Sequence, residues 1–489
     1  MLTPEKFPLT LPLRGGGALE LAAVVRYLPG RRLVCHGAWN GRPVYAKLFI
    51  GGKAGQDAER DASGVRAMRA ADIATPELLF DGDLTDGSGH ALVFAEVVGS
   101  SAEEAWRMLA HDPAARLELI TRLVQTAAAH HRAGLIQHDM YLKNFIVTST
   151  DIYTLDGDGI RCHAAPLGRR EGLGNLALLL SKFHAEDDVW LPQLLQHYAA
   201  ARAMELTAAE AQVFPSHVMT HRLRVVRGYA DRKVFRNCSG VIVERGWSHF
   251  TAIARAHDSE ALRRLLAGLE TRLRDPDVRM LKNGNTCTVL ALPLDGREVV
   301  VKRYNIKNFW HGLGRAWRPS RAAASWANAH RLQILGIATA QPLALLERRW
   351  GWLRRQAYFI AEHVDAPDAL AFFADASVAA ERKQQAAQAI AQLLHKLWRV
   401  GLVHGDMKAS NVLIGADDQP LLLDLDALHE VRCPWRLRRG HARDLRRWME
   451  NWRADPLTAG MMRQALQQVY RNEEGLLDAA IGMGKSENT

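Results

Sequence analysis

Two short stretches of sequence decide the fold, VHGDMKASNVLI at 403–414 and IQHDMYLKNFIV at 136–147. Each contains an aspartate and, five residues further on, an asparagine, namely Asp406 and Asn411 in one copy and Asp139 and Asn144 in the other. Each follows a helix-like stretch that ends in a basic residue and glycine, LWRVGL or HHRAGL. Since apolar residues come next, both pairs are predicted to lie on a loop between a helix and a strand.

Further matches flank both stretches in the same order along the chain. They are a lysine strand (GRPVYAKLF at 41–49, GREVVVKRY at 296–304), an IAT segment (DIATPELL at 72–79, GIATAQPL at 336–343) and an aspartate pair (YTLDGDG at 153–159, LLLDLDA at 421–427). The offset drifts slowly, from 255 between Lys47 and Lys302 to 268 between Asp156 and Asp424. Loop insertions in two related domains produce such drift, so the chain is predicted to be an internal duplication.

The duplication predicts an N-terminal domain over 1–228 and a C-terminal domain over 229–489, with the basic segment 221–233 as a candidate linker. Turn signals flank alternating apolar residues around each lysine, which predicts that each lysine lies on a strand after a hairpin. Helical periodicity fits 56–71, 115–133, 320–335 and 376–399. The predicted class is α+β in each half, with a β-rich small lobe followed by a helical large lobe.

Composition narrows the functional classes. The 489 residues suit two or three domains, and the 48% hydrophobic and 24% charged residues exclude a disordered chain. A net charge of +10 favours anionic partners such as phosphate groups, an acidic membrane face or nucleic acid. Five scattered cysteines favour a reducing compartment. With neither a signal peptide nor a transmembrane segment in view, we expect a cytoplasmic protein that can lie against a membrane.

The repeated carboxylates and amides favour phosphoryl-transfer chemistry. A carboxylate accepts a proton from an attacking hydroxyl, and a nearby amide oxygen is a ligand for Mg²⁺. Asp156 and Asp424 follow 17 and 18 residues after the first aspartates, beyond a strand, which is enough chain to return a second carboxylate to the same place. Phosphoryl transfer needs little more than this positioning and charge neutralisation.

These motifs resemble the protein-kinase-like superfamily, whose catalytic loop reads H-x-D-x-x-x-x-N and whose metal-binding aspartate begins a D-F-G-type triplet. HGDMKASNVLI, LLLDLDAL and VVVKRYNIKNFWHGLGRAWRPSRAAASW more closely resemble the bacterial lipopolysaccharide kinase family, which phosphorylates the core sugars Kdo or heptose. The resemblance covers most of 281–447 and, more loosely, 33–180. It implies ATP and Mg²⁺ as cofactors, a lipopolysaccharide core glycolipid as acceptor and a peripheral position on the cytoplasmic face of the inner membrane.

The resemblance also assigns roles. In the C-terminal copy, Asp406 would orient or deprotonate the acceptor hydroxyl and Lys408 would neutralise the γ-phosphate. Asn411 and Asp424 would hold Mg²⁺, and Lys302 would hold the α/β-phosphates. In the N-terminal copy the corresponding residues are Asp139, Asn144, Asp156 and Lys47. Tyr141 stands where Lys408 does, and Lys143 is the candidate to reach the same phosphate.

Two departures from the family pattern stand out. Kinases pair the strand lysine with a helix glutamate, but the matching residue in the C-terminal copy is Ser325, and the N-terminal copy offers Asp61 and the nearby Glu59. The segments expected over the phosphates, CHGAWNG (35–41) and KNGNTCTV (282–289), lack the G-x-G-x-x-G pattern. Gly284 and Asn285 remain candidates for a phosphate-binding turn.

Less specific interpretations of the same motifs stay open. A lone H-x-D is usually a surface turn, and a kinase-like domain with intact motifs can still be a pseudokinase scaffold. A protein kinase or a kinase of soluble small molecules also fits the motifs, whereas no nucleic-acid reader motif occurs. The Trp- and Arg-rich segment 308–321 suits an anionic membrane interface or a packed and solvated face. The acceptor hydroxyl, the working copy and the oligomeric state are left open.

Overall fold

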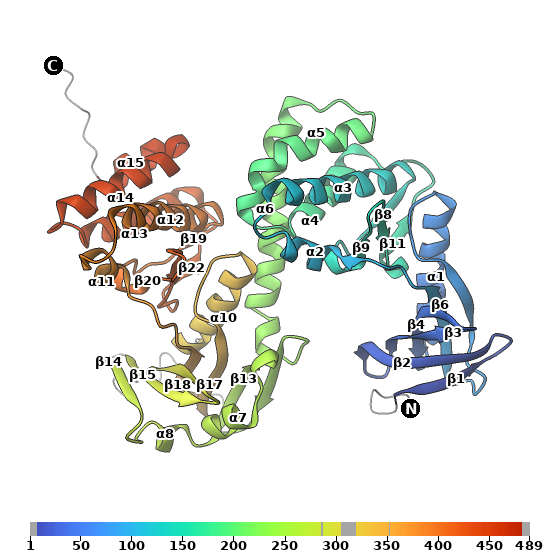
Figure 1. The fold of residues 1–489 in the computed structure, drawn as a ribbon, viewed down its shortest axis with the longest axis horizontal. Coiled ribbons are helices and arrows are strands. Elements are labelled where there is room, and N and C mark those ends of the chain that lie inside the picture. The colour runs from blue at the N-terminus through green and yellow to red at the C-terminus, as the bar shows by residue number, and fades with distance from the viewer. Residues whose placement is uncertain (1–6, 285–286, 305–318, 352, 482–489) are drawn as a thin grey trace. The chain divides into compact units, whose positions relative to one another are not determined.

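The computed structural model describes residues 7–284, 287–304, 319–351 and 353–481. The chain forms two compact units, Met1–Arg222 (unit 1) and Leu223–Thr489 (unit 2). Each unit contains an antiparallel sheet and a set of helices, which confirms the mixed α+β class (Figure 1). The division falls inside helix α6 (Ala208–Ala230), a few residues before the predicted boundary at 228–229. Most of the expected linker at 221–233 is therefore helical.

The sheet of unit 1 has the strand order β1-β2-β3-β4-β6-β5. Its strands are β1 (Leu9–Leu13), β2 (Gly17–Leu28), β3 (Arg32–Trp39), β4 (Arg42–Ile50), β5 (Leu78–Asp83) and β6 (Gly89–Ala95). Strand β4 lies between β3 and β6, and its residues Val44, Ala46 and Leu48 are fully buried. Because side chains alternate across a strand, Lys47 faces the opposite side of the sheet. Helix α1 (Ala54–Ala70) follows this strand directly.

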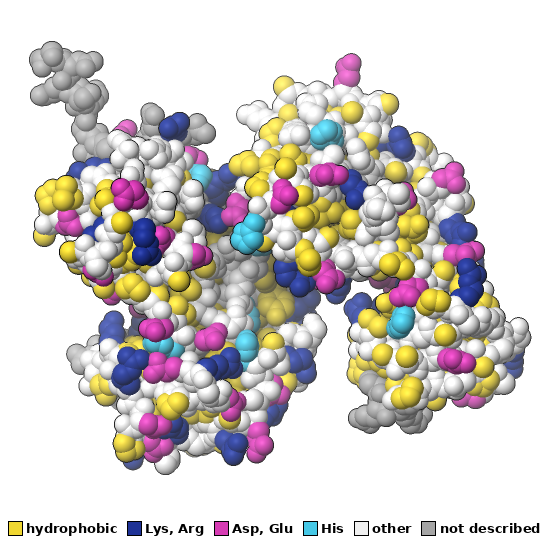
Figure 2. Space-filling view, in the orientation of Figure 1, with side chains coloured by type: hydrophobic (Ala, Val, Ile, Leu, Met, Phe, Trp, Pro, Cys, Tyr) yellow, Lys and Arg dark blue, Asp and Glu magenta, His cyan; other side chains and the backbone are white. Residues whose placement is uncertain are grey.

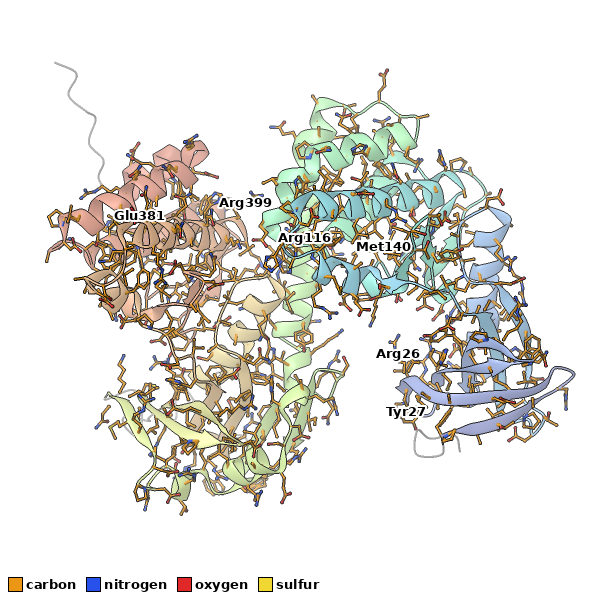
Figure 3. All side chains as sticks on the ribbon, viewed as in Figure 1. Arg26, Tyr27, Arg116, Met140, Glu381 and Arg399 are labelled. Carbon is orange, nitrogen blue, oxygen red and sulfur yellow. The ribbon has the colours of Figure 1, made fainter. Side chains whose placement is uncertain are left out.

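The rest of unit 1 is mainly helical. Its helices are α2 (Ala102–Met108), α3 (Pro113–Arg132), α4 (Arg169–Leu180), α5 (Leu191–Ala201) and the first part of α6. Its short strands are β7 (Ser100–Ser101), β8 (Leu135–Gln137), β9 (Phe145–Val147), β10 (Ile152–Thr154) and β11 (Ile160–Cys162). Met140, labelled in Figure 3, is buried in the core beneath α3, and it anchors the loop that carries Asp139.

The sheet of unit 2 has the strand order β12-β13-β17-β18-β16-β15-β14. Its strands are β12 (Val241–Arg245), β13 (His249–Ala254), β14 (Arg279–Asn283), β15 (Cys287–Leu294), β16 (Arg297–Tyr304), β17 (Pro342–Trp350) and β18 (Leu353–Glu362). Helices α7 (Glu260–Ala267) and α8 (Leu269–Arg272) separate β13 from β14, and α10 (Arg321–Ile334) precedes β17. Lys302 lies on β16, opposite Val289 on β15 and Phe359 on β18.

The remainder of unit 2 is also mainly helical. Its helices are α11 (Ala369–Ala374), α12 (Ala380–Arg399), α13 (Pro434–Glu450), α14 (Pro456–Val469) and α15 (Glu474–Ile481). Its short strands are β19 (Leu402–Val403), β20 (Val412–Ile414), β21 (Pro420–Leu422) and β22 (His429–Glu430). The four predicted helices correspond to α1, α3, α10 and α12, which confirms those predictions. No helix in the described ranges is long and apolar enough to cross a lipid bilayer.

Both sheets share one strand order around the lysine. In unit 1 the order is β2-β3-β4-β6-β5, and in unit 2 it is β14-β15-β16-β18-β17, with Lys47 on β4 and Lys302 on β16. In each unit another hairpin precedes the strand that carries the lysine. It is β2–β3, around Gly30, in unit 1 and β14–β15, around Gly284, in unit 2. The expectation for 35–41 was therefore wrong, because that segment forms β3 and its turn into β4.

Charged side chains of both signs are interspersed over the face of the molecule that Figure 2 shows. The net charge of +10 is therefore not gathered into one block on that face.

Candidate active site

In unit 2, Lys302 reaches from the sheet to the aspartate pair that follows β21. Its Nζ forms an ion pair with Asp424 and lies 4.0 Å from a carboxylate oxygen of Asp426. The lysine side chain is only 14% exposed, so these contacts are poorly screened by water. The lysine strand and the D-L-D segment are far apart in sequence, and the fold brings them together as the repeat predicted.

The helix position that carries a glutamate in kinases is occupied by Ser325 on α10. Its hydroxyl is 2.8 Å from the Tyr304 hydroxyl and serves that residue instead of Lys302. Asp426 supplies the second acid: its side chain is 5% exposed, and it also pairs with Arg321 at 2.5 Å. Burial raises the pKa of Asp426. Burial opposes charge on Asp424 as well, but the neighbouring Lys302 ammonium still lowers the pKa of Asp424.

The loop of unit 2 holds the Asp406 carboxylate between two cations. The Lys408 ammonium lies 3.0 Å from one carboxylate oxygen, and the Arg447 guanidinium on α13 lies 2.7 Å from the other. The side-chain amide of Asn411 donates to the Asp406 backbone carbonyl at 2.8 Å. Lys408 was expected here, whereas Arg447 is 41 residues further along the chain, and no local pattern marked it.

Backbone contacts lock this loop against its neighbours. Asp444 on α13 accepts hydrogen bonds from the backbone N–H groups of His404, at 2.7 Å, and Gly405, at 3.0 Å. The His404 ring lies 3.0 Å from the backbone carbonyl of Leu423, so this histidine packs the loop against the segment before Asp424. The Leu423 N–H in turn donates to the Asn411 carbonyl at 2.8 Å, which sets Asn411 beside Asp424.

The turn expected over the phosphates lies between β14 and β15, next to the lysine strand. Gly284 and Cys287 exchange backbone hydrogen bonds of 3.0 and 3.3 Å across it. Gly284 lies at this turn and its contact with phosphate stays a prediction, while Asn285 lies outside the described residues.

In unit 1 the strand lysine, Lys47, contacts two carboxylates. The Lys47 Nζ is 2.6 and 2.9 Å from the two carboxylate oxygens of Asp61 on α1, and 3.3 Å from Asp156. Burial raises the pKa of Asp61. Burial opposes charge on Asp156 too, but Lys47 lowers the pKa of Asp156. Arg26 on β2 adds to this effect, and it projects toward the helical part of the unit (Figure 3).

Glu59 does not join this group, so the prediction that placed it there was wrong. Two residues on a helix are about 200° apart, and Asp61 occupies the face that packs on the sheet. The Glu59 side chain is 63% exposed and pairs with Arg66 at 3.1 Å.

The loop of unit 1 keeps its backbone geometry but differs in its side chains. The Asn144 amide donates to the Asp139 carbonyl at 2.9 Å, as Asn411 does in unit 2. Within the described part of the chain, no ion pair involves the Asp139 carboxylate. Lys143, the expected phosphate contact, lies 5.5 Å from the ring centre of Tyr141, and Lys182 lies 4.7 Å from the same ring. Lys182 had no signal in the sequence.

The two units also differ in backbone conformation at the second aspartate. Asp424 has φ +57°, in the left-handed region, whereas Asp156 has φ −113°. Few residue types adopt the left-handed region readily, and aspartate is among those that do. The Asp424 carboxylate is therefore presented by a backbone turn that unit 1 does not form.

The donor set in each unit suits a hard divalent cation. In unit 2 the Asn411 amide nitrogen is engaged with Asp406, which turns its oxygen away from that bond, and Asp424 adds carboxylate oxygens. Oxygen ligands of this kind fit Mg²⁺ shared with phosphate groups. Among the described residues, no group of three His, Cys, Asp or Glu side chains is spaced to hold a metal ion.

Comparison with known proteins identifies the segment that carries this site. Residues 277–471 match the family described as Lipopolysaccharide kinase (Kdo/WaaP) family. No curated protein matches the chain significantly. The matched segment contains Lys302, Asp406, Asn411 and Asp424. Residues 277–471, the greater part of unit 2 but less than half of the whole chain, are therefore similar to a family of lipopolysaccharide kinases.

Proposed function

We propose that the chain transfers the γ-phosphoryl group of ATP to a sugar hydroxyl, of heptose or Kdo, in the lipopolysaccharide core. The observation that carries this proposal is the convergence of Asp406, Asn411 and Asp424 opposite Lys302 in unit 2. The family match supplies the substrate class, since no side chain in this group is specific for a sugar.

In the proposed reaction the acceptor hydroxyl oxygen attacks the γ-phosphorus as its proton passes to the Asp406 carboxylate. A bond forms between this oxygen and phosphorus, the bond to the β–γ bridging oxygen breaks, and ADP leaves with that electron pair. Lys302 holds the α/β-phosphates, and Lys408 moves from Asp406 to the γ-phosphate as the nucleotide enters. Asn411 and Asp424 would hold Mg²⁺, which would supply neutralisation of the phosphate charge. The backbone at Gly284 covers the phosphates.

We further propose that the units are tandem protein-kinase-like domains and that unit 2 performs the transfer. The shared strand order and loop geometry support the duplication. In unit 1, Lys47, Asp61, Asn144 and Asp156 keep a nucleotide site. No cation among the described residues forms an ion pair with Asp139 as Lys408 and Arg447 do with Asp406, and Tyr141 stands in the place of Lys408. Unit 1 therefore keeps the residues for nucleotide binding, whereas the surroundings of its Asp139 differ from those of the proposed proton acceptor Asp406.

We propose that the protein works at the cytoplasmic face of the inner membrane, bound peripherally through unit 2. The expected segment 308–321 lies mostly outside the described residues. Two neighbouring hairpin tips provide another contact: Trp247 is 70% and Trp350 is 68% exposed, and the Gly351 N–H donates to the Trp247 carbonyl at 3.0 Å. Exposed tryptophans beside arginines suit the headgroup level of a bilayer.

The test compares Asp406→Asn with Asp139→Asn in purified protein, with labelled ATP and lipopolysaccharide core acceptor. Asp406→Asn is expected to lower kcat by about 10³-fold, because it removes the proton acceptor and keeps the side-chain volume. Asp139→Asn is expected to retain most of the transfer. Unchanged transfer in Asp406→Asn would refute the assignment, and loss in Asp139→Asn alone would move the chemistry to unit 1. Transfer to proteins or soluble sugars instead of the core acceptor would refute the substrate class.

A further inference from the structure

Helix α13 presents four arginines on one face: Arg436, Arg439, Arg443 and Arg447, which we call the arginine row. They are three or four residues apart, and residues at this spacing lie on one side of a helix. All four side chains are exposed. At 1.5 Å per residue, the row extends over about 16 Å.

The row runs toward the reacting centre. Asp444, on the side of the same helix that packs on the loop, accepts hydrogen bonds from the backbone of His404 and Gly405. One turn later, Arg447 contacts the Asp406 carboxylate at 2.7 Å. The last arginine of the row is therefore at the atom that receives the acceptor's proton, and the others lead away from it along the helix.

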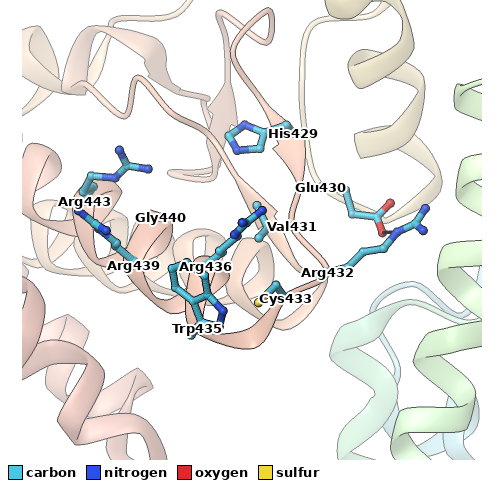
Figure 4. A pocket seen from close by; sticks show the side chains of 10 residues that line it. All are labelled: His429, Glu430, Val431, Arg432, Cys433, Trp435, Arg436, Arg439, Gly440 and Arg443. Carbon is cyan, nitrogen blue, oxygen red and sulfur yellow. Dashed lines mark hydrogen bonds and ion pairs between the residues drawn. The ribbon is translucent and has the colours of Figure 1, made fainter.

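A pocket of about 590 Å³ lies beside the first three arginines, between β22 and α13 (Figure 4). Arg436, Arg439 and Arg443 line it, together with His429 and the 60% exposed Trp435. Within the described ranges, none of these three arginines forms an ion pair with a carboxylate. Glu430 also lines the pocket, but its carboxylate pairs with Arg227 and Arg432. The pocket therefore combines three arginines that have no carboxylate partner among the described residues with one aromatic wall.

Unit 1 shows that the fold does not require this row. On α4, Asn175 stands where Asp444 does, and its amide donates to the Gln137 carbonyl at 2.8 Å to hold the equivalent loop. In this register Leu167, Gly174 and Leu178 take the places of Arg436, Arg443 and Arg447, and only Arg439 has an arginine, Arg170, in its place. The equivalent helix packs on the equivalent loop with one of the four arginines, so this packing does not require the row.

We propose that the arginine row is the acceptor subsite, which binds phosphate or carboxylate groups of the glycan whose hydroxyl meets Asp406. This inference rests on the proposed function of unit 2. Guanidinium groups pair with phosphate and carboxylate through two parallel hydrogen bonds, which fixes orientation as well as position. A row of such groups holds an anionic chain in register, so that one hydroxyl reaches the reacting centre.

The test uses the full-length double variant Arg439→Gln/Arg443→Gln, which leaves Arg447 and its contact with Asp406 in place. With delipidated core oligosaccharide as acceptor, the KM for the acceptor is expected to rise about tenfold, since exposed charge pairs contribute modestly each. The kcat and the KM for ATP stay unchanged. With an acceptor that is dephosphorylated and carboxyl-reduced, wild type and variant have the same KM. The matched control, Arg264→Gln/Arg463→Gln, removes the same charge from exposed sites on α7 and α14 and leaves the acceptor KM unchanged.

An unchanged acceptor KM in the double variant, or an equal rise in the control variant, would overturn the proposal. If wild-type protein transfers nothing to any core acceptor, the proposed function fails, and calorimetric titration of the oligosaccharide still decides the inference. Oligosaccharide binding that weakens in the double variant but not in the control variant supports the acceptor subsite, and equal binding by wild type and the double variant overturns it. Vesicles of phosphatidylglycerol without glycan test whether the phosphate that the arginine row binds comes from a lipid headgroup. Loss of vesicle binding with unchanged oligosaccharide binding would assign the row to headgroups and refute the acceptor subsite.

Discussion

Asp426 replaces the helix glutamate of kinases as the buried partner of Lys302, and Asp426→Asn tests this role. Asparagine keeps the volume and removes the charge. Opposite charges 4.0 Å apart, as in Lys302 and Asp426, attract by about 4 kcal/mol at an effective dielectric constant of about 20. Lys302 retains its contact with Asp424, so we expect about half of this, ~2 kcal/mol, to be lost from nucleotide positioning. That corresponds to a fall of roughly 30-fold in kcat/KM for ATP.

The assay is steady-state phosphoryl transfer at varied ATP and at varied Mg²⁺, with acceptor saturating. A positioning residue changes kcat/KM for ATP and leaves the half-saturating Mg²⁺ concentration unchanged. Asp418→Asn is the matched control, because it breaks a remote ion pair with Arg382 in the same unit and is expected to leave kcat/KM within about twofold.

Two outcomes would refute the reasoning on Asp426. An unchanged kcat/KM would mean that Lys302 needs no second acid. A large rise in the half-saturating Mg²⁺ concentration would make Asp426 a metal ligand. Asp61→Asn, which removes the partner of Lys47, is run in parallel. If only that variant loses activity, the transfer occurs in unit 1.

Two further predictions concern stability and membrane contact. Burial lowers the pKa of His441 from 6.5 to about 3, so the folded chain excludes a proton that the unfolded chain binds. The contribution of neutral His441 to the free energy of unfolding is intact above pH 6.5 and falls by about 1.4 kcal/mol per pH unit below that. In urea unfolding, the free energy of unfolding of His441→Gln should therefore decrease less steeply with falling pH than that of wild type. Equal slopes would contradict this. For the hairpin tips, Trp247→Ser/Trp350→Ser is expected to weaken sedimentation with anionic vesicles by about tenfold or more while transfer to delipidated acceptor persists; unchanged sedimentation would exclude these tips as the contact.

Local pattern predicted the parts of the site that repeat. The lysine strands and the Asp and Asn loops are encoded by short, duplicated motifs, and the structure places each where the order of motifs implied. The partner of Lys302 had no signal in the sequence of the helix over 320–335, because the acid, Asp426, lies on the segment after β21. Periodicity cannot show such an exchange between distant elements.

Long-range contacts and local geometry account for the other differences. Arg447 meets Asp406 only because α13 packs along the loop, and Lys182 approaches Tyr141 in the same way. Glu59 was misplaced by nearness in sequence, since the helix turns it away from Asp61. The phosphate-covering segment of the first half was misplaced at 35–41, because its glycines belong to a strand and its turn.

The left-handed backbone at Asp424 constrains how this residue can be studied and how it can vary. With φ at +57°, alanine at this position would remove the carboxylate and also disfavour the turn that presents it. An inactive Asp424→Ala protein would thus confuse ligand chemistry with local refolding. Asparagine tolerates the same conformation, so Asp424→Asn separates the two. The same restriction leaves natural sequences few replacements at this position, whatever ion or nucleotide the protein binds.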